Sequence, residues 1–230
     1  LVHGLDADAK NVETARKHIQ SVGRYGKVSV EQWSAPRLPY AENLVNLIVV
    51  SGECPVSNDE LLRVLAPNGV ALFINSQFAI RNPPLKKPWP KTMDEWTHYR
   101  HAADGNMVSK DALAGPPRHL QWIDQPQWQR HHGTVPSITT VVSSAGRLFS
   151  ISDEPPMGVA GLPERWQLTA RDAFNGLVLW RRPMDDWGSS AWSYYTEGHT
   201  ARFNHPIQIA KRLVAVGDRV YVTPGFNSPV

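Results

Sequence analysis

The stretch LVHGLDADAKNVETARKHI, residues 1–19, decides the fold of the first part of the chain. Its apolar start ends in an acid at Asp6, and an apolar helical stripe follows, with Val12, Ala15 and Ile19 three and four residues apart. In open α/β sheets that carry a glycine-rich loop, the loop lies roughly 20 residues before such an acid. We therefore expect the first strand and its loop to precede residue 1.

The following segments continue the alternation of strands and helices. Further strands are predicted at 27–31, 45–52 and 70–74, and a second helix at 57–65. The apolar run VNLIVVSG, residues 45–52, is typical of a parallel strand that is covered on both faces. Ser57 and Glu60 have capping-box spacing, and PNG at 67–69 predicts a turn. Residues 1–80 are thus predicted to form an open α/β sheet.

The composition changes near residue 88, because only Trp33 of the nine tryptophans precedes it. Four prolines in RNPPLKKPWPK, residues 81–91, cannot continue a helix or a central strand. We predict a linker over residues 81–93. The remaining residues, 94–230, contain short runs rich in Val, Leu, Trp and Tyr, separated by turn formers, which indicates an all-β domain of antiparallel strands.

Three hairpins are predicted in this second part. They are VVSSAGRLFSIS at 141–152, WQLTARDAFNGLVLWRR at 166–182 and LVAVGDRVYVT at 213–223. In the second hairpin Asn175 and Gly176 tolerate positive backbone angles, and Asp172 can accept hydrogen bonds from turn amides. Hairpins that recur around a tryptophan are typical of propeller blades.

Charge and hydropathy exclude several partners. The formal charge is +3, with 24 basic residues scattered among 21 acidic ones, so we predict no nucleic-acid partner. No apolar run approaches the roughly 20 residues of a transmembrane segment, so none is predicted. A single cysteine, Cys54, excludes an internal disulfide.

Two histidine pairs raise a metal hypothesis. The pairs are His98 with His101, and His131 with His132. No acid or cysteine is arranged with them as a matching ligand set, so we predict hydrogen-bonded histidines and no metal.

The order GLDADAKNVETAR, RLPYAENLVNLIVV, ELLRVLAPNGVALFI over residues 1–76 resembles class I S-adenosylmethionine-dependent methyltransferases. The resemblance implies a Rossmann-like sheet, entered partway through, with S-adenosylmethionine as the cofactor. It implies that Asp6 accepts hydrogen bonds from the ribose hydroxyls, with Ala7 beside it. Ser34 stands where the family commonly has an acid that holds the adenine amino group, and Gly52 lies toward the substrate.

Alternatives remain for these residues. Asp6 has equal standing as a turn or helix-capping carboxylate, and Glu53 is more typical of a solvated loop than of catalysis. Methyl transfer from an activated sulfonium needs positioning rather than a nucleophile, so no catalytic residue is identified.

Two segments of the second part resemble pyrroloquinoline-quinone-repeat β-propellers. They are DEWTHYRHAADGNMVSKDALAGPPRHLQW at 94–122 and ARDAFNGLVLW at 170–180. The resemblance implies structural repeat roles for Asp172, Gly176 and Trp180, with Trp180 docked between neighbouring blades near the equivalent glycine. About one and a half blades cannot supply the ligands of a quinone site, so bound quinone is not expected.

Two functions follow from these resemblances. The first is methyl transfer to an unknown acceptor by a methyltransferase-like domain fused to a propeller, with residues 1–230 expected to be an inactive fragment on their own. The second is a non-catalytic propeller that binds a protein, a glycan or a small molecule beside a degenerate methyltransferase-like segment. An active donor site implies a cytoplasmic protein, and an exported propeller implies the periplasm or cell envelope.

Overall fold

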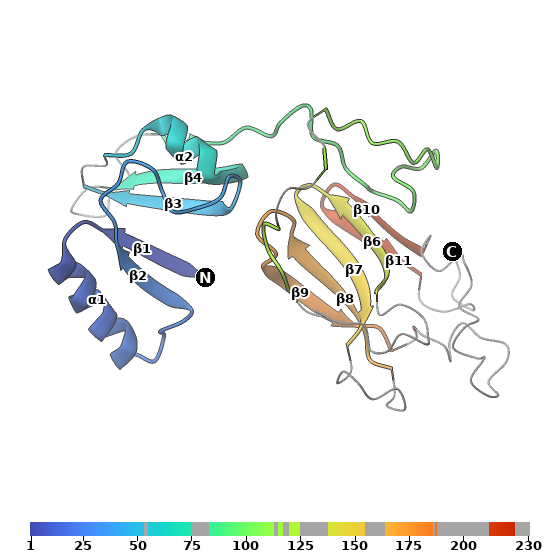
Figure 1. Ribbon diagram of the computed structural model, residues 1–230. Helices are drawn as coiled ribbons and strands as arrows, with labels where there is room; N and C mark the ends of the chain where they lie inside the picture. Colours follow the sequence, from blue (N-terminus) through green and yellow to red (C-terminus); the bar gives the residue numbers. More distant parts are fainter. Residues whose placement is uncertain are drawn as a thin grey trace.

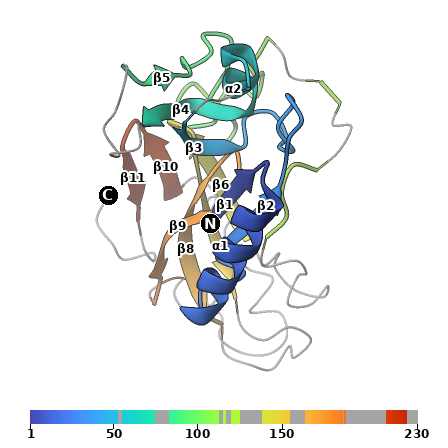
Figure 2. The same cartoon turned by 90° about the vertical axis from the view of Figure 1, so that its left-hand side faces the viewer.

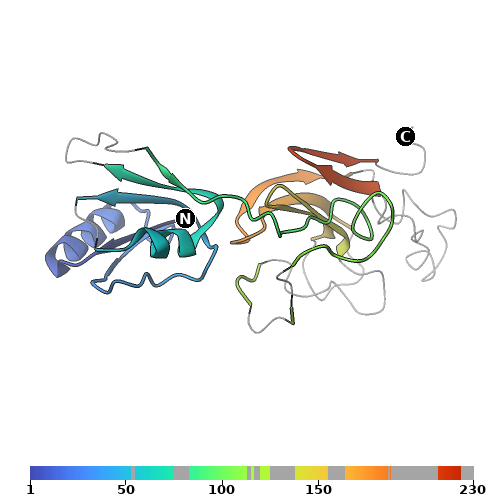
Figure 3. The ribbon, with the colours of Figure 1, turned by 90° about the horizontal axis from the view of Figure 1, so that it is seen from above.

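The computed structural model describes residues 1–52, 55–74, 83–112, 115–116, 120–124, 138–154, 164–185, 187 and 212–223. Residues 1–86 form an α/β part, and residues 94–223 include a strand-rich part. Figure 3 shows the two parts side by side, joined by the green segment that follows β5. No helix in the described ranges is long and apolar enough to cross a membrane.

The α/β part alternates strands and helices as predicted. Its elements are β1 (Val2–Asp6), α1 (Ala9–Ser21), β2 (Val28–Gln32), β3 (Val45–Ser51), α2 (Asn58–Val64), β4 (Leu65–Ile74) and β5 (Leu85–Lys86). β1 pairs with β2 and β3 pairs with β4, both in parallel, and β5 joins β4 antiparallel. This is a Rossmann-like arrangement (Figure 1), but the described strands form two sheets, β1-β2 and β3-β4-β5, rather than the single predicted one.

Both helices begin at a capping side chain, Asp8 for α1 and the predicted Ser57 for α2. The Asp8 carboxylate accepts a hydrogen bond from the Lys10 amide at 2.8 Å and caps α1, and Val12 is the buried residue of this helix. Figure 2 shows α1 lying against β1 and β2. Ser57 caps α2 by accepting from the Glu60 amide at 3.2 Å. The capping box is only half formed, because the Glu60 carboxylate bonds elsewhere.

The prediction that residues 45–52 form a strand covered on both faces is wrong. Ile48 packs with the buried cluster around α2, whereas Leu47 and Val49 on the opposite face are 55% and 53% exposed. α2 covers only one face of β3, and α1 packs on β1-β2 instead. β3 is therefore as hydrophobic as a fully buried strand, but among the described residues only one of its faces is covered.

The predicted turn at PNG, residues 67–69, lies inside β4 rather than between α2 and the strand. β4 begins at Leu65, but its pairing with β3 passes from Leu65 directly to Val70, and Asn68 has φ of +66°. The Asn68 amide donates to the Lys87 carbonyl oxygen, and the Lys87 amide donates to the Gly69 carbonyl oxygen, each at 3.0 Å. Residues 85–86 of the predicted linker thus belong to the sheet, because pairing with β4 satisfies their backbone.

The strand-rich part contains a four-stranded antiparallel meander and a separate hairpin. The meander is β6 (Ile138–Ser144), β7 (Arg147–Asp153), β8 (Trp166–Asp172) and β9 (Val178–Pro183), in that order, and the hairpin is β10 (Leu213–Val216) with β11 (Arg219–Val222). All three predicted hairpins are confirmed. A meander of this kind is the form of a propeller blade, but the described strands close no ring, so the propeller stays a prediction.

The segment that precedes β6 in the sequence joins the meander to the hairpin. The Trp96 carbonyl oxygen accepts from the Ser143 amide in β6 at 2.8 Å, and the Thr97 carbonyl oxygen accepts from the Ala215 amide in β10 at 2.9 Å. β6 and β10 lie beside each other (Figure 1) and share one buried cluster. Residues 96–97 therefore supply the hydrogen bonds that β6 and β10 do not make to each other.

Candidate functional site

Three of the predicted cofactor residues lie together where β1 and β2 end. The Asp6 carbonyl oxygen accepts a hydrogen bond from the Trp33 amide at 2.9 Å. Gln32 Nε2 donates to the Ala7 carbonyl oxygen at 3.0 Å. Because Ser34 directly follows Trp33, the structure brings Asp6, Ala7 and Ser34 to the carboxyl edge of the β1-β2 pair.

The Asp6 carboxylate also organises the start of α1. Its Oδ1 accepts from the Asp8 amide at 2.7 Å, and its Oδ2 accepts from Asn11 Nδ2 at 3.2 Å. These are the contacts of a turn carboxylate, the alternative that the sequence left open. Each carboxylate oxygen can accept two hydrogen bonds, so Asp6 retains capacity for ligand hydroxyls.

Ser34 and Gly52 complete the predicted set. Both are exposed, and Ser34 offers a hydroxyl without the negative charge that an acid would place there. Gly52 follows β3, whose carboxyl end lies on the same side of the α/β part as that of β1 (Figure 1). No hydrogen bond in the described ranges joins Gly52 to Asp6, Ala7 or Ser34. Glu53 lies outside the described residues.

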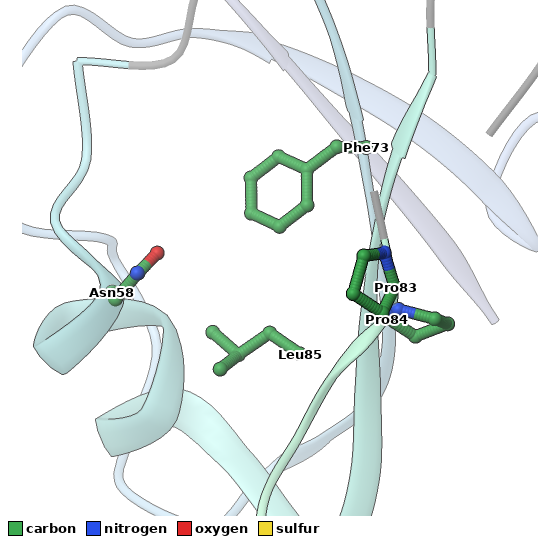
Figure 4. Close-up of a pocket in the computed structure, with 5 residues that line it drawn as sticks. All are labelled: Asn58, Phe73, Pro83, Pro84 and Leu85. Carbon is green, nitrogen blue, oxygen red and sulfur yellow. The ribbon is translucent and has the colours of Figure 1, made fainter. Parts of the chain in front are cut away.

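A cavity of about 360 Å³ opens near the carboxyl end of β4. Figure 4 shows Phe73 of β4 and Leu85 of β5 pointing into it, opposite Asn58 at the start of α2. Among the described residues, Pro83 and Pro84 also line it. The volume is within the range of small-molecule sites, but none of the residues predicted from the sequence lines this cavity.

A charged clamp that sequence reasoning missed fixes the LPY turn, residues 38–40. Arg63 and Glu60 of α2 form a two-fold ion pair, with Arg63 Nε and Nη2 each 2.7 Å from a Glu60 oxygen. Arg63 also donates to the carbonyl oxygens of Tyr40 and Leu38, at 3.0 and 3.2 Å, and Glu60 Oε1 accepts from the Leu38 amide at 2.7 Å. The methyltransferase-like LPY and ELLR sequences thus interlock structurally. Their only local signal was the spacing of Glu60 and Arg63.

This clamp predicts acid sensitivity. Hydrogen bonds from Arg63, and more weakly from the Leu38 amide, lower the pKa of Glu60 from 4.5 to about 2. A lowered folded-state pKa stabilises the fold above pH 4.5, and that contribution is lost as the pH falls from 4.5 toward 2. We expect urea unfolding midpoints to fall across this window, and to fall less steeply in Arg63→Met. The exposed Asp59→Asn control should keep the wild-type slope, and identical slopes in all three proteins would contradict the prediction.

A second polar group connects the two sheets of the α/β part. Tyr40 Oη lies 2.9 Å from His3 Nδ1, and the rings meet edge to face with centroids 5.7 Å apart. His3 Nε2 lies 3.7 Å from a Glu31 carboxylate oxygen. Burial, and secondly the Glu31 charge, raise the pKa of Tyr40. The LPY turn therefore contacts β1 through Tyr40 and α2 through the clamp.

The repeat residues of the strand-rich part lie at the β8-β9 turn. Asp172 Oδ1 accepts from the amides of Phe174 and Asn175 at 2.8 and 3.1 Å, as predicted for a turn carboxylate. The indole seated on Gly176 belongs to Trp122, whose Nε1 donates to the Ala173 carbonyl oxygen at 3.1 Å. Trp180 is 39% exposed in β9, and its ring centroid lies 6.0 Å from that of Phe149.

In the described part of residues 94–122, His101 forms structural hydrogen bonds. His101 is buried, with Nε2 2.7 Å from Asp94 Oδ2 and Nδ1 3.0 Å from the Asn106 carbonyl oxygen. The Lys110 amide, followed by the Glu95 amide and His101, lowers the pKa of Asp94 to about 2. Within the described ranges no three metal-ligating side chains gather, and His131 and His132 lie outside them.

No protein-family model and no curated protein matches the chain. Among solved structures it is similar to the YcgJ protein from Bacillus subtilis, with 25% identity, 32% of this chain and 33% of that chain covered, and a TM-score of 0.29. The [4+2]-cyclase SpnF has 23% identity, coverage of 31% and 28%, and a TM-score of 0.29. A putative sarcosine dimethylglycine methyltransferase from Galdieria sulphuraria has 19% identity, coverage of 31% and 29%, and the same TM-score. The chain thus spans about a third or less of the length of each.

Proposed function

We propose that the α/β part is a methyltransferase-type domain that holds S-adenosylmethionine through Asp6, while the strand-rich part contacts a substrate or partner. The observation that supports this proposal most directly is the placement of Asp6, Ala7 and Ser34 at the carboxyl edge of parallel strands. In α/β sheets this edge is where nucleotide ligands bind. The acceptor of the methyl group is not specified by any described residue.

The residues present fit part of such a ligand. The Asp6 carboxylate has acceptor capacity for ribose hydroxyls beyond its bonds to Asp8 and Asn11. S-Adenosylmethionine supplies an activated methyl group, so the protein's contribution is to orient donor and acceptor. Ser34 offers the adenine amino group only a neutral hydroxyl, which makes a weaker bond than a carboxylate.

A non-catalytic binding protein is the second candidate function. Two observations favour it. The Asp6 carboxylate already stabilises the start of α1, and Ser34 lacks a negative charge. In that case the strand-rich part would hold a protein, glycan or small-molecule partner. A cytoplasmic location accompanies the first function, and a periplasmic or envelope location accompanies the second.

Titration with S-adenosylhomocysteine, followed by NMR, separates the two. Methyltransferase ancestry with a working ribose contact predicts amide shifts confined to Asp6, Ala7, Ser34 and Gly52, with binding weaker than micromolar. Asp6→Asn keeps the Oδ1 acceptor for the Asp8 amide but removes the charge, so we expect about tenfold weaker binding or more. Asp59→Asn on α2 is the matched control and should bind as wild type. Equal binding by Asp6→Asn, or no localised shifts at all, would favour the binding protein.

A further inference from the structure

The two parts of the chain meet through a set of side-chain amides and one carboxylate. Asn46 Nδ2, at the start of β3, donates to Asp172 Oδ2 at 2.8 Å, and Asn46 Oδ1 accepts from Asn175 Nδ2 at 2.6 Å. Asn175 Nδ2 also donates to the Leu44 carbonyl oxygen at 3.2 Å. These contacts, here called the junction, join residues 126 to 131 positions apart in the sequence.

Gln121 adds a bridge across the junction. Its Nε2 carries two hydrogens, and it donates to the Glu42 carbonyl oxygen at 3.1 Å and to the Phe174 carbonyl oxygen at 2.9 Å. One amide therefore spans from the loop before β3 to the β8-β9 turn. In the described part of the chain, the groups that form hydrogen bonds between the loop at 42–46 and the turn at 172–176 are neutral side-chain amides, a backbone carbonyl and the Asp172 carboxylate.

The strand-rich side of the junction is supported by several contacts of its own. The β8-β9 turn is held by Asp172 Oδ1 from within, by Trp122 seated on Gly176, and by Trp89, whose ring centroid lies 6.1 Å from that of Phe174. Asp172 uses Oδ1 for the turn and presents Oδ2 to Asn46. Apart from its bonds to the α/β part, the turn is therefore held by contacts of its own.

The hydrophobic cores do not cross the junction. The described cluster of the α/β part is built around Leu61, Leu65 and Ala71, and that of the strand-rich part around Ile151, Leu168 and Leu213, with no residue in common. Small polar contacts between separately cored units are typical of reversible domain interfaces.

We infer that the β8-β9 turn, residues 172–176, is a docking surface whose partner is the loop and strand start at 42–46 of the same chain, and that the Asn46–Asp172 pair controls whether the two parts are closed or open. Asn46 is the suitable position to perturb, because its described side-chain bonds both cross the junction. Asn175 is less suitable, because its Oδ1 also accepts from the Leu177 amide within the turn.

Charge at position 46 gives a direct test. Asn46→Asp places a carboxylate against that of Asp172, so the pair changes from a charge-assisted hydrogen bond to repulsion, and we expect the open population to rise about tenfold. Adding Asp172→Asn exchanges the two groups. The new amide at position 172 would keep its oxygen for the turn amides and present its nitrogen to the new carboxylate at position 46. The double variant should therefore return to the closed state.

The measurement is the distance distribution between spin labels at positions 17 on α1 and 219 on β11, both exposed, in a Cys54→Ser background. Asn46→Asp should broaden and lengthen the distribution, less so in about 1 M salt, where the Debye length falls to roughly 3 Å. Asn11→Ala, which removes one comparable amide bond within the α/β part, is the control and should match wild type. The inference is overturned if Asn46→Asp leaves the distribution unchanged. It is also overturned if the exchanged double variant, folded by circular dichroism, stays open.

Discussion

Replacing Gly176 with alanine is expected to lower the free energy of unfolding by about 2–4 kcal/mol. A Cβ at this position would lie 2.5 Å from both Cδ2 and Cε3 of Trp122, and the backbone has φ of +73°. The indole cannot retreat without losing its Nε1 bond to the Ala173 carbonyl oxygen. Overpacking against a rigid ring and a left-handed backbone therefore act together.

Gly217 provides a matched control for this substitution. It also has a left-handed backbone, with φ of +59°, but a Cβ there would meet nothing within 4 Å. Gly217→Ala should cost only about 1 kcal/mol, the conformational share alone. Chemical denaturation followed by circular dichroism measures both. Equal losses in the two variants would mean that the Trp122 contact carries no weight.

Arg63→Met is expected to destabilise the fold by about 2–4 kcal/mol. The Arg63 side chain is only 19% exposed, and its guanidinium bonds to the Glu60 carboxylate and two carbonyl oxygens of the LPY turn. Methionine fills similar volume but leaves these acceptors without their donor, Glu60 being 14% exposed. The loss should also release the turn from α2.

Two further variants test the reason for this loss. The double change Glu60→Met with Arg63→Met should be less damaging than Arg63→Met alone, because it leaves no partly buried carboxylate without its cation. Lys17→Met breaks the exposed Lys17–Glu13 pair on α1 and should cost under about 0.5 kcal/mol. A double variant worse than the single one would show that the clamp acts through packing rather than charge.

The order of elements could be predicted because its signals are local. The apolar strand before Asp6, the stripe of α1 and the turn formers of the three hairpins each lie within one element, and the structure places an element at each. The one-sided burial of β3 could not be predicted. Hydrophobicity alone does not reveal whether a neighbour covers Leu47 and Val49.

The candidate site could be predicted only in part. The residue pattern placed Asp6 at a strand end, the family resemblance pointed to Ser34, and the parallel pairing of β1 with β2 brought them to one edge. The contacts of the Asp6 carboxylate with Asp8 and Asn11 could not be predicted, since an acid at a strand end has the same sequence signature as a turn carboxylate and as a ribose ligand.

Local sequence dictates where strands, helices and turns occur, and it marks the change of composition near residue 88. Which residues hold these elements together depends on the three-dimensional fold. Glu60 reaches Leu38 across 22 positions, Trp122 reaches Ala173 across 51, and Asn46 reaches Asp172 across 126. Such partners leave no periodic trace in the sequence, because they are chosen by packing after the chain has folded back on itself.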